Sequence, residues 1–500
     1  MGKERMQFDM TFGRSRGTGT RHDDEDPMRI LVLGNFSGHG DAQRTPPFAQ
    51  RLPIAVDIDN LDKVLARLAP QLELAFDGVP VTIEFHSIDD FHPDRLFERL
   101  APFVALRKLR AELNDAATYQ RAAQALGARP SAAASPPGNT KDATADIERL
   151  LGRRQAVAPA AATGVDIQDW LRTIVAPHIV PDDTEQRQLI GGVDAALAEQ
   201  MRRVLHHPSF QALEAAWRGI DRLVRELETG ETLQVFLLDA SRDDLVRDTE
   251  TAAADPSQSS LYRHLCGPAT QTPAGDRWSL LVVDHAFGID ADDVRLLAIL
   301  GALAAQSGAP LLAAARLDVL GCAGVLQLSE PKSWTPSDAQ THWGALRKSV
   351  AAPAIGLALP RILARLPYGA ASDPIESFAF EELPQVRDHE AYLWGNPAFA
   401  LALLAGQAFE EDGWDLDLER HIDAAGLPTH IYREDGEAKQ QPCAEVLISE
   451  SAGEAILARG LMPLLSYRNR DAARLLRWQS VAEPAQALQG AWVAVGPAEE

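Results

Sequence analysis

The chain has 500 residues, 46% of them hydrophobic, and a formal net charge of −23. A chain of this length is expected to fold into more than one domain. The acidic charge argues against nucleic acid or an anionic membrane surface as the main partner. The three cysteines are too few and too widely spaced for a disulfide framework or a paired metal site, and they favour a reducing, cytoplasmic location: Cys266, Cys322 and Cys443.

The first predicted unit is residues 28–115. It follows residues 1–27, which have no apolar signal-peptide core and for which we expect a mobile tail. Within the unit, the apolar run at 28–33 and the alternating patterns at 54–58 and 79–85 predict strands. Leucine and valine at helical spacing predict a helix over 60–74. Pro93 suits the first turn of a second helix, whose apolar stripe continues to Leu113.

Within residues 116–165, the stretches ARPSAAASPPGNTKDATAD and AVAPAAATG are rich in alanine and hold almost no large apolar side chains, so we predict a linker over 116–165. The second unit is residues 166–500. It begins with a short amphipathic helix at 166–175, followed by two longer helices between 189 and 230 that Pro208 separates, with Ser209 as the expected N-cap. Apolar runs predict strands at 233–238, 280–283, 310–315 and 355–359, with a helix at 294–305. This alternation predicts a mixed α/β (α+β) fold.

Gly34, Gly38 and Gly40 directly follow the first predicted strand, at a spacing found in some dinucleotide-binding turns. Such a turn needs a helix that begins at the last glycine, so that backbone N–H groups face the pyrophosphate. The chain continues instead into Pro46 and Pro47, which favour a loop. We therefore favour a role in a tight exit from the edge of a sheet, with a nucleotide-binding enzyme as the remote alternative.

Other polar residues suggest chemistry only weakly. His206 and His207 are adjacent on a helix, point about 100° apart, and lack a matching Cys/His pair. The acidic residues between Asp89 and Asp94 suit a turn and a helix cap. The Asp284–His285 pair follows a buried strand, where α/β enzymes place catalytic residues, but no nucleophile accompanies it. We predict no catalytic residue, no metal ligand and no cofactor.

Two aromatic clusters have two interpretations that the sequence does not separate. Trp217 and Arg218 form one cluster, and Trp394 and Asn396 belong to the other. Either cluster suits core packing, with the arginine bonded to a carboxylate or stacked on a ring. Either also suits an interface anchor, because tryptophan and arginine are favoured there.

The second unit resembles the large sheath subunit of bacterial type VI secretion, TssC or VipB. The resemblance rests on VLHHPSFQALEAAWRG at 204–219, in a patch that begins at Asp194, DASRDDLVRD at 239–248, GLALPRILARLPYG at 356–369, and YLWGNPAFA at 392–400. The first unit resembles the small sheath subunit, TssB or VipA, through RILVLGNFSG, IAVDIDNLDKVL and HSIDDFHPDRLFERLAPFVALRKLRAEL. The chain as a whole is similar to a natural fusion of the two, with the small subunit first.

The resemblance implies a structural part of a contractile sheath that works by self-assembly and contraction and not by catalysis. It implies partners: copies of the chain or separate sheath subunits, an Hcp-like inner tube, a baseplate and a ClpV-like AAA+ unfoldase. The helix at 166–175 is the nearest counterpart of the helix that the unfoldase grips. The family's large subunit continues past the region matched here, so we expect a truncated C-terminus, and a non-polymerising cap or regulator is the alternative. The residues expected to pack or to form interfaces are His206, His207, Phe210, Trp217, Arg218, Pro360, Arg361, Arg365, Pro367, Tyr368, Trp394, Asn396 and Trp414.

Overall fold

The structure is a computed structural model that describes residues 26–38, 46–76, 79–126, 171, 174–175, 185–252, 255–267, 277–335, 340–384 and 388–492. Gly40, the tail before residue 26 and most of the predicted linker lie outside the described residues. So does most of the helix predicted at 166–175, of which Leu171, Ile174 and Val175 are described and buried. Residues 116–126 of the predicted linker are described, and they include the short helix α4 (Tyr119–Ala125).

The largest sheet in the described part of the chain has nine strands. Six strands are parallel, in the spatial order β14-β8-β7-β6-β1-β5. Antiparallel strands complete both edges, with β2 beside β5 and with β15 and β11 beyond β14. The strands are β1 (Met28–Gly34), β2 (Ile54–Val56), β5 (Leu233–Asp239), β6 (Leu280–Phe287), β7 (Leu311–Ala315), β8 (Ile355–Leu359), β11 (Asp423–Ala424), β14 (Met462–Ser466) and β15 (Ala473–Leu475).

Helices cover both faces of this sheet. Successive side chains of a strand point to opposite faces, so Ile30 and Val32 of β1 join one hydrophobic core, and Leu31 and Leu33 join the other. Burial on both faces explains why β1 is apolar throughout. The first core is completed by α8 (Pro208–Glu226) and α14 (Pro397–Asp412), and the second by α9 (Arg242–Thr251), α10 (Ser260–Cys266), α12 (Ala291–Ser307), α13 (Gln340–Arg347) and α15 (Glu450–Leu457).

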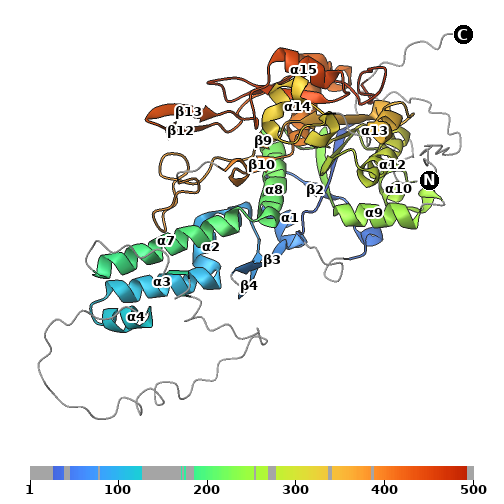
Figure 1. The fold of residues 1–500 in the computed structure, drawn as a ribbon. Helices are drawn as coiled ribbons and strands as arrows, with labels where there is room; N and C mark the ends of the chain where they lie inside the picture. The colour runs from blue at the N-terminus through green and yellow to red at the C-terminus, as the bar shows by residue number, and fades with distance from the viewer. Residues whose placement is uncertain are drawn as a thin grey trace, which may run out of the picture.

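A second group of elements extends away from the sheet (Figure 1). The helices α2 (Pro93–Arg99), α3 (Ala101–Asn114) and α4 lie along α7 (Glu185–Leu205), near the hairpin of β3 (Gln71–Phe76) and β4 (Val79–Glu84) and the helix α1 (Leu61–Leu68). Phe85 stacks on Phe91 at 4.1 Å between ring centroids, and both rings contact Phe210 at the start of α8. These rings join the extension to the central sheet.

The two predicted units meet in one sheet. The strand β1 comes from the first unit and lies between β5 and β6 of the second, pairing with both in parallel. The predicted division therefore describes the order of segments along the chain, while the folded core is shared. The mixed α/β fold predicted from the sequence is confirmed.

Three local predictions are wrong, each for a physical reason. The helix expected over 60–74 ends at Leu68, because Ala69 adopts a left-handed conformation (φ 47°) before Pro70, and the remaining leucines belong to β3. The stripe from Pro93 to Leu113 is split into α2 and α3 at Leu100, with Pro102 in the first turn of α3. The turn after β1 does not leave the edge of a sheet, since β1 is an interior strand.

The cap of α8 also differs from the prediction. His207, and not Ser209, is the N-cap, and its Nδ1 accepts a hydrogen bond from the backbone N–H of Ser209 at 3.3 Å. Pro208 occupies the first helical position, and the helix ends at Glu226, before Gly230.

Smaller two-stranded sheets lie outside the central one. The strands β9 (Ile362–Leu363) and β10 (Trp394–Gly395) pair beside α8, and β12 (His430–Glu434) and β13 (Glu437–Gln441) form a hairpin that projects from the body (Figure 1). No helix in the described part of the chain combines the length and the apolar character needed to cross a bilayer.

Candidate functional site

A buried ionic network joins α8 to the segment that follows β8. Nε of Arg365 donates to Oε1 of Glu214 at 2.8 Å, and its Nη1 donates to Oε2 of Glu382 at 2.7 Å. The three side chains are almost completely enclosed, with 6%, 0% and 1% of their surface exposed. The guanidinium also lies 4.1 Å from the centroid of the Tyr368 ring.

Arg218 adds a second cation to this network, beside Glu214. Its Nε donates to Oε1 of Glu214 at 2.8 Å, and its Nη2 donates to the hydroxyl of Tyr368 at 3.1 Å. Two cations thus meet two anions in the protein interior, where an unpaired charge would be costly. Burial by itself raises the pKa of Glu382, but the charge of Arg365, together with His206 and with hydrogen bonds from Arg365 and the backbone N–H of Tyr368, lowers this pKa to about 2.

Three predicted packing residues therefore gather in one network, through two acids that the sequence analysis missed. Arg218, Arg365 and Tyr368 were predicted, whereas Glu214 and Glu382 were not. Glu214 lies one helical turn before Arg218 and on the same face as the apolar residues of α8, and this spacing was the available signal. Glu382 follows an irregular segment, where periodicity gives no signal.

His206 and His207 do not converge on a common point. Nε2 of His206 lies 3.6 Å from Oε1 of Glu382, an ion-pair distance, while His207 caps α8. Within the described residues, His389, Glu390 and Glu445 have ligand atoms close enough for a metal ion. Arg361 already fills that position, because its Nη2 lies 2.7 Å from Glu445 and 2.9 Å from Glu390. This cluster is therefore an ion-pair network.

The predicted tryptophans contact other parts of the same chain. Trp217 is fully buried against Phe36, and its indole N–H donates to the carbonyl of Phe36 at 3.0 Å. Trp394 stacks on His389 and donates to its carbonyl oxygen at 2.8 Å. Trp414 is half-buried, and its indole N–H donates to the carbonyl of Asp26 at 2.6 Å.

The remaining predicted packing residues lie at turns and caps. The peptide bond between Leu359 and Pro360 is cis, directly after β8. The carbonyl oxygen of Pro367 accepts a hydrogen bond from the hydroxyl of Ser372 at 2.5 Å. Asn396 caps α14 by accepting from the backbone N–H of Ala398 at 2.9 Å.

The glycine turn after β1 is filled by protein side chains. A Cβ on Gly34 would lie 3.1 Å from Cβ of Asp284 and 3.1 Å from the ring of Phe36. The backbone N–H of Ser37 donates to Oδ1 of Asp239 at 3.0 Å. From Gly34 to Gly38 no helix begins, so the described part of the turn lacks the helix N-terminus that a pyrophosphate site needs.

Asp284 and His285 lie at an irregularity of the pairing between β6 and β7. Burial raises the pKa of Asp284 to about 6, partly offset by a hydrogen bond from Asn396. Burial also lowers the pKa of His285 to about 4, together with the nearby charge of Arg242. Protein atoms surround both groups, although part of each residue remains exposed to solvent. Both pKa shifts favour the uncharged form of the side chain.

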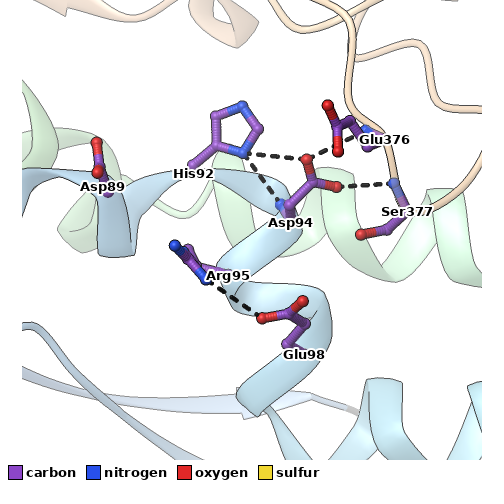
Figure 2. A pocket seen from close by; sticks show the side chains of 7 residues that line it. All are labelled: Asp89, His92, Asp94, Arg95, Glu98, Glu376 and Ser377. Carbon is purple, nitrogen blue, oxygen red and sulfur yellow. Dashed lines mark hydrogen bonds and ion pairs between the residues drawn. The ribbon is translucent and has the colours of Figure 1, made fainter.

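A polar cavity of about 340 Å³ lies between α2 and residues 376–377 (Figure 2). At its centre, the carboxylate of Asp94 accepts hydrogen bonds from the backbone N–H groups of Glu376 and Ser377 at 3.1 and 2.9 Å. His92 lies beside Asp94, and Arg95 pairs with Glu98 along the helix. The carboxylate therefore joins the first part of the chain to the second, as does the ion pair of Arg110 with Asp194 between α3 and α7.

Comparisons with known proteins agree with this arrangement. Residues 187–482, more than half of the chain, match the VipB family model, described as EvpB/VC_A0108, tail sheath N-terminal domain. Residues 3–129 match the model described as type VI secretion system, VipA, VC_A0107 or Hcp2. The type VI secretion system sheath protein TssC1 of Pseudomonas aeruginosa strain PAO1 is 34% identical over 306 residues, which cover 60% of this chain and 61% of the relative.

Both matched regions point to the class of contractile-sheath proteins. The chain belongs to the VipB tail-sheath family of type VI secretion, and a VipA-like part precedes its VipB-like part. The chain spans about 61% of the length of the relative that it matches.

Proposed function

We propose that this protein is a structural component of a type VI secretion sheath, which assembles with copies of itself or with separate sheath subunits. The observation that carries the proposal is the shared sheet, in which β1 of the VipA-like part lies between β5 and β6 of the VipB-like part. One chain therefore supplies both parts of a sheath unit, already joined in register.

The polar groups also favour assembly over catalysis. The buried network of Arg365 pairs its charges fully, and Arg361 is held between two carboxylates. Such networks fix one packing of segments that are distant in the chain, and they leave few groups poised for reaction. We propose that the protein works through changes in packing between subunits and has no enzymatic activity.

The proposal extends to location and partners. A sheath of this family suggests a cytoplasmic protein that surrounds an Hcp-like inner tube, starts from a baseplate and is dismantled by a ClpV-like unfoldase. Membership of the sheath family is the basis for proposing these partners. Packing residues that remain half-buried, such as Trp414, are proposed to contribute to contacts between subunits.

The test is assembly of the purified full chain, alone and with inner tube protein, followed by negative-stain electron microscopy. Tubes or stacked rings are expected. Particles that stay monodisperse with and without the tube protein would contradict a sheath role. In parallel, calorimetry with nucleotides should give no binding heat, whereas saturable binding that Gly38→Val removes would support the nucleotide-binding alternative.

A further inference from the structure

A surface on the β12–β13 hairpin has the composition of an interface in an otherwise acidic protein. Ile431 is 66% exposed, and Arg433 lies on the same face of β12, two residues further on. Gln440 is opposite Ile431, and its Oε1 accepts the backbone N–H of Asn469 at 2.7 Å. This bond places the turn between β14 and β15 against the same face of the hairpin.

That turn adds two more cations. Arg468 and Arg470 are exposed on either side of Asn469, whose φ of 60° sets the turn. Among the described residues, neither these two arginines nor Arg433 makes an ion pair, and Arg470 only rests over the Tyr467 ring. We call Ile431, Arg433, Arg468 and Arg470 the basic patch. An exposed aliphatic side chain bordered by arginines is a typical interface composition.

The chain carries a complementary surface at the end of α14. Asp412, Asp415 and Glu419 are exposed, and within the described structure their carboxylates make no ion pair. Acidic groups at the C-terminal end of a helix face the negative end of its dipole, so Asp412 is unfavourably placed in an isolated copy. The half-buried Trp414 lies among them. We call these four residues the acidic corner.

We propose that the basic patch of one copy docks on the acidic corner of a second copy of this chain. The partner is identified by charge, because three arginines and three carboxylates that make no ion pair within the described residues are complementary, on a chain whose net charge is −23. The two surfaces differ, so the contact is head-to-tail and can continue from copy to copy. This inference rests on the proposed function, since it names a contact by which the copies would assemble.

The test is a charge exchange in the full chain. One variant carries Arg468→Glu and Arg470→Glu, and the other carries Asp412→Lys and Asp415→Lys. Sedimentation at low and moderate salt measures self-association. Each variant alone is expected to associate at least about tenfold more weakly than the wild type, because like charges then face each other. An equal mixture is expected to recover wild-type association, since every contact in an alternating chain is again complementary.

The matched control is Lys63→Glu with Arg67→Glu, the same change of charge on exposed residues of α1. It should leave association within about twofold of the wild type. A basic-patch variant no weaker than this control, a mixture without recovery, or a wild type that stays monomeric at low salt would each overturn the docking. Self-association that the variants weaken and their mixture restores, but that forms no tubes or rings, would support the docking and contradict the sheath role. Circular dichroism confirms that each variant is folded.

Discussion

Replacement of Asp284 by asparagine is expected to stabilise the protein at neutral pH. Burial raises the pKa of this carboxyl from 3.8 to about 6, so the folded state holds a proton more tightly than the unfolded state does. Between these two pH values the folded state binds more protons, and the stability of the wild type falls as pH rises through the window. Above this pH window, the folded state is destabilised by the full free-energy cost of a charged, desolvated carboxylate.

The size of the effect follows from the shift. About two pKa units at roughly 1.4 kcal/mol each give about 3 kcal/mol, and we take about 1–3 kcal/mol because the side chain is half-buried and water screens part of the cost. Asparagine has nearly the same shape and carries no charge at any pH. It also keeps an oxygen that can accept the hydrogen bond from Asn396.

The measurement is urea unfolding of the wild type and Asp284→Asn at several pH values from 4 to 8. The variant should be more stable at pH 7 to 8, and the difference should shrink towards zero near pH 4. Asp59→Asn, at an exposed aspartate, serves as the control and should change stability by less than about 0.5 kcal/mol. A difference that is constant with pH, or a variant that is less stable at pH 7, would refute the reasoning.

Three further predictions concern the buried network and the packing of helices. Glu382→Gln should lower the free energy of unfolding by about 3 kcal/mol at pH 7. Because the pKa of Glu382 is depressed in the folded state, this loss should vanish as pH falls from 4.5 through about 2, and unfolding at several pH values tests this. Arg365→Met leaves two enclosed carboxylates without their main partner and should cost about 3–5 kcal/mol, whereas a loss below 1 kcal/mol would speak against the network. Gly219→Ala puts a Cβ 2.6 Å from the ring of Phe399 and should cost about 1–3 kcal/mol in thermal unfolding, while Gly191→Ala, with nothing within 4 Å, should be neutral or stabilising.

The apolar pattern predicted the buried elements well, because a strand covered on both faces must be apolar throughout. The runs that became β1, β5, β7 and β8 were each predicted within one or two residues. Where prediction failed, local chemistry overrode periodicity. Leu72 and Leu74 fit a helical stripe and a strand equally well, and the turn at Ala69 and Pro70 decided between them.

The site was harder to predict, since it depends on pairs that are distant in the chain. Arg365 and Tyr368 were predicted from resemblance to a family, but their acidic partners lie 151 and 14 residues away from them. No pattern in one sequence indicates that Glu214 and Glu382 face the same guanidinium. The position of β1 between β5 and β6 was likewise hidden, because sequence order does not set spatial order in a sheet.

The insertion of β1 also sets how this protein must be made. The strand β1 is synthesised about 200 residues before either of its neighbours in the sheet, β5 and β6. Although both of its faces are apolar, β1 has no neighbouring strand to pair with until β5 and β6 emerge from the ribosome. Covalent joining holds it near them at a high effective concentration and fixes one copy of each part for every sheet. Proteolytic cleavage between residues 127 and 184 would turn this arrangement into a two-chain complex, whose refolding after dilution should become dependent on concentration.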